Sequence, residues 1–106
     1  MKSAAGMAVA VASDFNPGSS PCCNLQLAMN LACLRLSLTP AEALCAVTLN
    51  AAAAVEMAAT HGSIEVGKRA DLLLWDAPDL ETIFYRYGTN LVHTVVKGGN
   101  VTTEAN

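Results

Sequence analysis

Asp14 is the residue of this sequence best placed to do chemistry. It follows the apolar run Ala-Val-Ala-Val-Ala at residues 8–12 and opens the run Asp-Phe-Asn-Pro-Gly-Ser-Ser at residues 14–20. The apolar run predicts a short strand that is buried on both faces. A carboxylate at the end of such a strand must face a cleft, a metal ion or a cation. In parallel α/β architectures, this end of a strand is where ligands bind and reactions occur.

The residues after Asp14 predict a polar turn followed by a helix. Asn-Pro-Gly at residues 16–18 is typical of a tight turn, in which Gly18 permits a positive φ or a close backbone approach. Ser20 followed by Pro21 predicts a helix start, and the apolar spacing predicts a helix over residues 21–36.

The remaining elements follow from caps, glycines and apolar runs. Thr-Pro-Ala-Glu at residues 39–42 is a capping box that predicts a second helix, broken at Asn50 and continued to about residue 59. The rest of the chain predicts, in order, a short strand over residues 62–66, an apolar strand ending at Trp75, a helix over 80–86, a strand over 91–96 and a hairpin turn at 97–100.

The composition excludes several classes of protein. The chain is 53% hydrophobic and 14% charged, which excludes disorder, but only 5% of it is aromatic. A chain with many small and few large apolar side chains could be either an independent domain or one part of a larger packed body. A net charge of −3 with six scattered Lys and Arg residues gives no footprint for nucleic acid.

No apolar stretch is long enough to span a membrane, and the N-terminal apolar run ends too soon at Asp14 to predict secretion. The four cysteines, at positions 22, 23, 33 and 45, lack a metal-binding spacing. They predict free thiols in a reducing compartment, which is the cytosol.

The other polar residues predict structural roles. His61 and His93 are the only histidines, and neither has a neighbour at metal-ligand spacing. We expect both to be structural or surface residues. Lys68, Arg69 and Asp71 are expected to belong to a solvated hairpin and its strand packing.

Three motifs together point to a family. They are the run at residues 14–20, Thr-Pro-Ala-Glu-Ala-Leu at 39–44, and Gly-x-Ile-x-x-Gly-Lys-x-Ala-Asp-Leu at 62–72. In this order and spacing they resemble the C-terminal part of the imidazolonepropionases, within the amidohydrolase superfamily, over essentially residues 1–101. The third motif resembles the amidohydrolase superfamily at large, whereas the first resembles the imidazolonepropionases in particular.

The resemblance implies an α/β fold that is incomplete. Residues 1–60 would be the last strand, the substrate and metal loop, and the following helices of a (β/α)8 TIM barrel. Residues 61–106 would be the C-terminal strands of a small composite β-sandwich. The chain would therefore begin within the barrel and be a C-terminal fragment or a truncated product.

The resemblance also implies a reaction and its residues. The family hydrolyses 4-imidazolone-5-propanoate to N-formimino-L-glutamate in histidine degradation, with one zinc or iron ion. Asp14 matches the last metal ligand and catalytic carboxylate of the family. By the same resemblance, Asn16 and Gly18 would hold polar groups of the product, and Ser19 would contact the substrate.

The family's His-x-His pair and later histidine ligands have no counterpart in this sequence. We therefore expect the isolated chain to be inactive with added zinc or iron, and aggregated or loosely packed. The expected partner is the small-molecule substrate, with no nucleic acid and no membrane, and the complete enzyme could be a homo-oligomer.

Two alternatives stay open beside this hypothesis. The first is another metal-dependent amidohydrolase, such as a deaminase or a cyclic amidase. The Asn-Pro-Gly turn argues against it, since other branches place different residues after the aspartate. The second is a non-catalytic module that pairs with a full-length subunit. It is favoured for the isolated chain, because one carboxylate cannot retain a catalytic ion.

Overall fold

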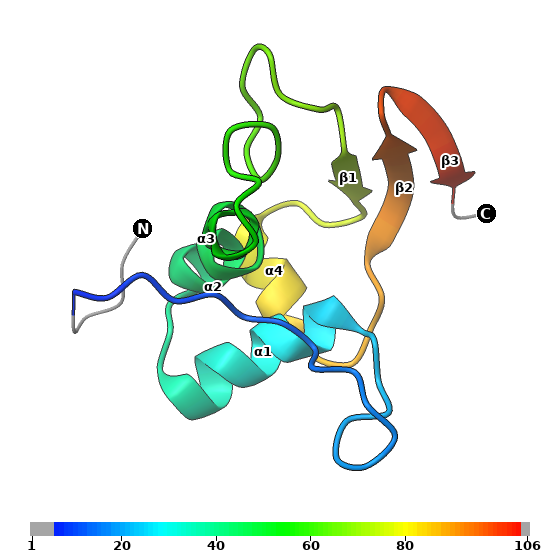
Figure 1. Cartoon of the computed structure of the whole chain (residues 1–106). Helices are drawn as coiled ribbons and strands as arrows, with labels where there is room; N and C mark the ends of the chain where they lie inside the picture. The colour runs from blue at the N-terminus through cyan, green and yellow to red at the C-terminus, as the bar shows by residue number, and fades with distance from the viewer. Residues whose placement is uncertain (1–5, 105–106) are drawn as a thin grey trace.

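Helices and a small antiparallel sheet form two parts of the computed structural model, which describes residues 6–104. Figure 1 shows the helices on one side and the sheet on the other. Within this range the elements are α1 (Leu25–Leu36), α2 (Pro40–Val47), α3 (Leu49–Ala54), β1 (Leu72–Trp75), α4 (Leu80–Tyr85), β2 (Val92–Lys97) and β3 (Asn100–Glu104). The sheet order is β1-β2-β3 with both pairs antiparallel, so β1 and β3 are its edges.

The second half of the chain forms most of the predicted elements. The apolar strand, the helix after it and the next strand appear as β1, α4 and β2. The predicted hairpin turn at residues 97–100 joins β2 to β3, with Lys97 paired to Asn100. These predictions are confirmed.

Helix α1 begins at Leu25 rather than at Pro21. Its cap is Asn24, whose side-chain oxygen accepts a hydrogen bond from Leu27 N at 3.1 Å. Ser20, the predicted cap, instead donates its hydroxyl to a backbone carbonyl earlier in the chain. The prediction of a helix start at Ser20 is wrong because this hydroxyl is part of the preceding loop.

The capping box at the start of α2 is confirmed. Glu42 N donates to Thr39 Oγ1 at 3.2 Å, and Thr39 N donates back to Glu42 Oε1 at 3.1 Å. Such a cap stabilises a helix by about 1 kcal/mol. The break that follows lies at Thr48, not at Asn50, because Thr48 Oγ1 donates to Leu44 O at 2.7 Å and competes with the helical pattern.

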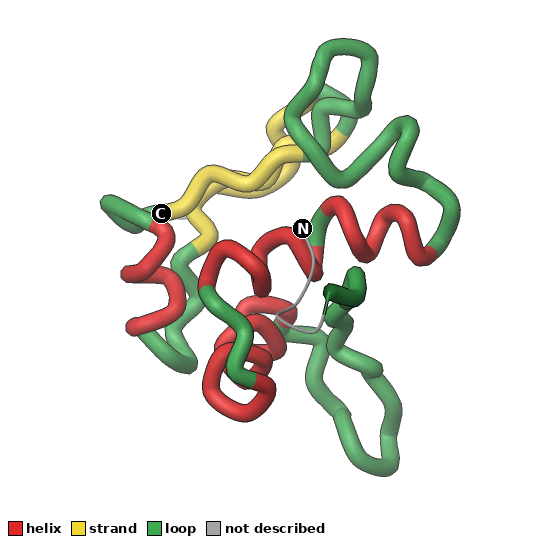
Figure 2. Tube along the Cα trace, turned by 90° about the vertical axis from the view of Figure 1, so that its left-hand side faces the viewer, coloured by secondary structure: helices red, strands yellow, loops and turns green. Residues whose placement is uncertain are grey.

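A long loop over residues 55–71 joins α3 to β1 (Figure 2). The predicted strand over residues 62–66 and the helical continuation beyond Ala54 are therefore wrong. Lys68 N donates to Glu65 O at 3.1 Å, which closes a turn instead of an extended run. No strand within residues 6–104 pairs with this loop.

The segment of residues 8–12, predicted as a strand, runs across the helices without strand pairing (Figure 1). Val11 N donates to Ala46 O at 3.1 Å, and the side chain of Asn50 donates to Val9 O at 2.9 Å. Alternate residues are half-buried and exposed, so one side is covered rather than both. The prediction fails because the described part of the chain offers no neighbouring strand with which this segment could pair.

The core lies where α1, α4 and the start of β2 meet. Its buried residues are Met29, Ile83 and Leu91. Half-buried apolar side chains surround them: Leu44, Val47, Trp75, Ala77, Leu80 and Phe84. The buried Gln26 completes the junction, since its Nε2 donates to Thr89 O at 2.6 Å and its Oε1 accepts from Leu91 N at 3.2 Å.

Candidate functional site

Residues 13–20 form a closed loop, which we call the Asp14 loop. It lies at the lower right of Figure 1, between the extended segment and α1. Asn16 N donates to Ser20 O at 2.9 Å, and Ser20 Oγ donates to Ser13 O at 2.8 Å. These two contacts close the neck of the loop.

The side chain of Asn16 organises the interior of the Asp14 loop. Its Nδ2 donates to Asp14 O at 2.7 Å, while its Oδ1 accepts from Gly18 N at 2.9 Å and from Ser19 N at 2.8 Å. A Cβ at Gly18 would lie 3.2 Å from that oxygen, so glycine leaves room for the turn. The four residues predicted to form the site, Asp14, Asn16, Gly18 and Ser19, are therefore brought together.

Asp14 itself is exposed and has a φ of +50°, in the left-handed region. Aspartate tolerates this region better than most residues, because its short polar side chain can bond locally. Its carboxylate makes no hydrogen bond or ion pair with any residue from 6 to 104. The loop thus presents a free carboxylate.

A cavity of about 490 Å³ lies between the Asp14 loop and α1. Ser19, Ser20 and Arg35 contribute its polar lining together with Asn24, and the rest is mainly apolar. A second cavity, of about 1070 Å³, opens between the helices and the sheet. Asp14 lines neither of them.

The described residues do not complete a metal site. Among them there is no group of three or more His, Cys, Asp and Glu side chains that could hold an ion. Asp14 is therefore a single candidate ligand. Within residues 6–104 no disulfide bond joins any two of the cysteines.

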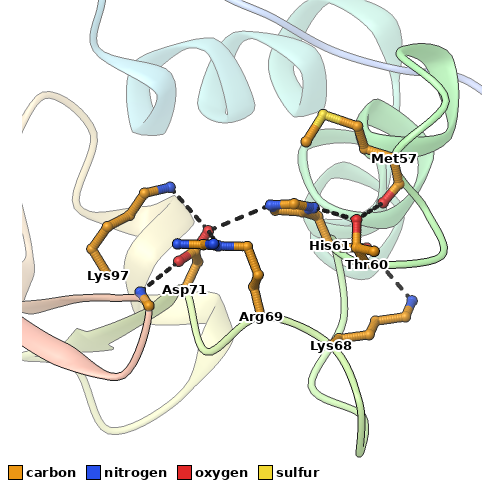
Figure 3. Close-up of polar contacts among 8 residues, drawn as sticks. Met57, Thr60, His61, Lys68, Arg69, Asp71 and Lys97 are labelled. Atoms are coloured by element: carbon orange, nitrogen blue, oxygen red, sulfur yellow. Dashed lines mark hydrogen bonds and ion pairs between the residues drawn. The ribbon is translucent and has the colours of Figure 1, made fainter.

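A second polar cluster centres on Asp71, far from the Asp14 loop along the chain (Figure 3). Its Oδ2 lies 2.9 Å from Lys97 Nζ, 3.7 Å from Arg69 Nε and 3.8 Å from His61 Nε2. Gly98 N donates to Asp71 Oδ1 at 2.8 Å. The cluster ties the long loop to the β2–β3 turn.

The hydrogen bond from Gly98, followed by that from Lys97, lowers the pKa of Asp71 to about 2. The expected structural roles of Asp71 and His61 fit this geometry. No local pattern in the sequence marks Lys97 as a partner of Asp71, because 26 residues separate the two.

The sequence of the chain, including the Asp14 loop, matches the model of one protein family. The profile of the amidohydrolase family covers residues 1–102. The chain belongs to the amidohydrolase family. Within residues 6–104, none of this amidohydrolase's helices is long and apolar enough to cross a membrane.

Curated relatives of this amidohydrolase support the resemblance to imidazolonepropionases. It is 54% identical over 96 residues to a protein named imidazolonepropionase from Brevibacillus brevis, covering 91% of this chain and 23% of the relative. A relative of the same name from Geobacillus sp. is 54% identical over 101 residues, covering 95% of this chain and 24% of the relative. The chain spans about a quarter of the length of these relatives.

A solved structure confirms the fold class of this amidohydrolase. The crystal structure of an amidohydrolase from Thermotoga maritima superposes with a TM-score of 0.72 at 23% identity. The match covers 94% of this chain and 24% of the solved chain. The chain therefore has the fold of one part of an amidohydrolase, with its small antiparallel sheet.

The lowered pKa of Asp71 predicts a loss of local stability in acid. The stabilisation is present above the unfolded pKa of about 4 and is lost as the pH falls toward the folded value of about 2. The readout is amide hydrogen-exchange protection at Gly98, in a chimera that carries this chain in place of the matching segment of the Brevibacillus relative. Protection should fall between pH 4 and pH 2. Asp71→Asn should lack this dependence and Asp76→Asn should retain it; equal profiles for all three proteins would contradict the assignment.

Proposed function

We propose that this chain supplies the Asp14 loop of an imidazolonepropionase, which hydrolyses 4-imidazolone-5-propanoate to N-formimino-L-glutamate. The observation that carries the proposal is the 54% identity, over 95% of this chain, to a protein of that name. The exposed carboxylate of Asp14 in a self-organised loop supports it. Because the chain spans about a quarter of its relatives, the reaction is that of the whole enzyme.

A divalent zinc or iron ion is the proposed cofactor, and Asp14 fits it as one ligand. Carboxylate oxygen is a suitable donor for either metal, and this carboxylate is free within residues 6–104. The described residues do not fit a complete site, since no three candidate ligands gather among them. When bound in the whole enzyme, such an ion lowers the pKa of a water molecule toward 7.

Asp14 would act on the proton of the attacking water. One carboxylate oxygen accepts that proton as the water oxygen bonds to the ring carbonyl carbon. The C–N bond of the cyclic amide then breaks, and the carboxyl group returns the proton to the departing ring nitrogen. One side chain thus serves as base and then as acid, and the step leaves Asp14 unchanged.

The rest of the Asp14 loop is the proposed substrate contact. Asn16 and Gly18 would hold the polar groups of the product, and Ser19 would contact the imidazolone. Ser19 also lines the cavity beside α1, which places it at the border between the loop and an open space. These assignments rest on the resemblance and on the clustering of the residues in one loop.

The proposed division into two parts follows the distribution of elements. Helices α1, α2 and α3 fall within residues 1–60, which we assign to the barrel part, whereas every strand of residues 6–104 falls within 61–106, assigned to the β-sandwich part. Large exposed apolar side chains occur in both parts: examples are Leu34, Leu36, Ile64, Val66 and Leu74. These exposed side chains support a requirement for the rest of an amidohydrolase to cover them. The proposed location of the enzyme is the cytosol, whose reducing conditions keep cysteines as thiols.

The chimera with the Brevibacillus relative tests the function. We expect it to convert 4-imidazolone-5-propanoate to N-formimino-L-glutamate when loaded with zinc or iron, as followed by chromatography of both compounds. The isolated chain with the same metals should show no turnover. A folded, metal-loaded chimera that leaves the imidazolone intact, or turnover by the isolated chain, would contradict the proposal.

A further inference from the structure

Ser20 joins the two sides of the neck of the Asp14 loop. We infer that Ser20 is a positioning residue, whose hydroxyl fixes the peptide bond before Asp14 and so sets the direction in which the Asp14 carboxylate meets the metal ion. The inference rests on the proposed function of Asp14. It adds to that function a residue that is neither the metal ligand nor one of the proposed substrate contacts.

Ser20 makes two contacts across the neck. Its Oγ donates to Ser13 O at 2.8 Å, and its carbonyl oxygen accepts from Asn16 N at 2.9 Å. Ser13 and Ser20 are half-buried, whereas Asp14 between them is exposed. A hydrogen bond that is partly shielded from water is stronger than an exposed one. The hydroxyl bond of Ser20 is therefore a firm anchor beside a free carboxylate.

The bond to Ser13 acts directly on the backbone of Asp14. Ser13 O and the N–H of Asp14 belong to one planar peptide unit, so a bond to that oxygen holds the whole plane. Asp14 has a φ of +50°, which a residue with a side chain keeps only where its surroundings hold it. With the plane and φ both fixed, the direction of the Cα–Cβ bond of Asp14 is fixed as well.

Two other roles for the Ser20 hydroxyl fit the structure less well. A cap would accept from the first N–H groups of α1, but Asn24 is the cap of that helix. A contact with the carboxylate or ring carbonyl of the substrate would need the hydroxyl as a donor, and its single O–H is already given to Ser13 O. The anchor on Ser13 is thus the use that the structure assigns to this hydroxyl.

Ser20→Ala in the chimera removes the hydroxyl and leaves the backbone contact from Asn16 N in place. Replacing a residue that orients a metal ligand typically changes metal affinity or activity by about 10–100-fold. We expect about a 10-fold loss of zinc affinity, measured by chelator competition, and a similar fall in kcat at saturating zinc, because the bond reaches Asp14 only through the backbone. KM should stay unchanged, since Asn16 Oδ1 still accepts from Gly18 N and Ser19 N and keeps the turn closed.

Two further variants separate positioning from a loss of stability. Ser20→Thr keeps the hydroxyl, and a residue before proline favours the extended backbone that suits a β-branched side chain, so zinc affinity and kcat should match the wild type. Thr48→Val removes a hydroxyl bond of similar length and burial, to Leu44 O at 2.7 Å, from the junction of α2 and α3. It should keep wild-type zinc affinity and kcat, whatever its melting temperature.

Several results would overturn the positioning role. One is wild-type zinc affinity and kcat in Ser20→Ala. Another is a raised KM with normal zinc affinity and kcat, which would make Ser20 a substrate contact. Equal losses in Ser20→Ala and Ser20→Thr would show that the hydroxyl is not responsible, and an equal loss in Thr48→Val would reduce the effect to stability.

The Asp14→Asn variant distinguishes this inference from the proposed function. If Asp14→Asn loses zinc while Ser20→Ala does not, only the positioning role fails. If Asp14→Asn keeps both zinc and turnover, the proposed function fails.

Discussion

Asp14→Asn in the chimera is expected to lower kcat by about 1,000-fold, which corresponds to ~4 kcal/mol of transition-state stabilisation. Asparagine has nearly the same shape and tolerates the left-handed φ of +50° at this position, so the loop is retained. The change removes the charge that would bind the ion and the oxygen that would accept the proton. Steady-state kinetics and metal analysis of the purified chimera measure the two losses.

Asp79→Asn provides the matched control for this loss. Asp79 caps α4 by accepting from Thr82 N at 2.8 Å, and asparagine is an equally good cap. The substitution removes the same charge without altering the Asp14 loop. A similar fall in kcat for both variants would mean that the effect is not specific to Asp14.

Gly62→Ala is expected to destabilise the chimera by roughly 3 kcal/mol or more, because overpacking and backbone strain act together. Gly62 has a φ of +94°, and a Cβ there would lie 2.9 Å from Ala52 Cβ and 3.0 Å from the backbone of Leu49 and of Thr48. The long loop could then no longer lie against the start of α3. Denaturant titration of the purified protein measures the free energy of unfolding.

Gly67→Ala separates strain from overpacking. Gly67 has a similar φ of +91°, but a Cβ would meet no atom within 4 Å. Its substitution should therefore destabilise the protein through backbone strain alone, by about 1 kcal/mol. Equal losses of unfolding free energy for the two variants would show that the contact of Gly62 with α3 contributes nothing to stability.

The sequence predicts correctly those elements that depend on a short, local pattern of residues. The capping box of Thr39 and Glu42 and the hairpin turn after Lys97 depend on residues a few positions apart. Ser20 and Pro21 form an equally common pattern for a helix start. That prediction is wrong because the hydroxyl of Ser20 donates to Ser13 O instead of capping a helix. A cap signal therefore fails where a tertiary or loop contact competes for the same side chain.

The remaining errors and omissions concern contacts between distant residues. The apolar run at residues 8–12 has the pattern of a strand, but pairing depends on a neighbour that residues 6–104 do not provide. The cluster around Asp71 joins residues that are far apart in sequence, and no local pattern marks it. The Asp14 loop was different, because its motif is contiguous, although the use of the Asn16 side chain within the loop became visible only in the structure.

The most direct test of the central claim, that Asp14 is a metal ligand of the complete enzyme, is the anomalous scattering of zinc in crystals of the zinc-loaded chimera. We expect one metal peak with a carboxylate oxygen of Asp14 at about 2.0–2.2 Å. A fully occupied metal site that Asp14 does not contact would show that Asp14 is not a metal ligand of the enzyme.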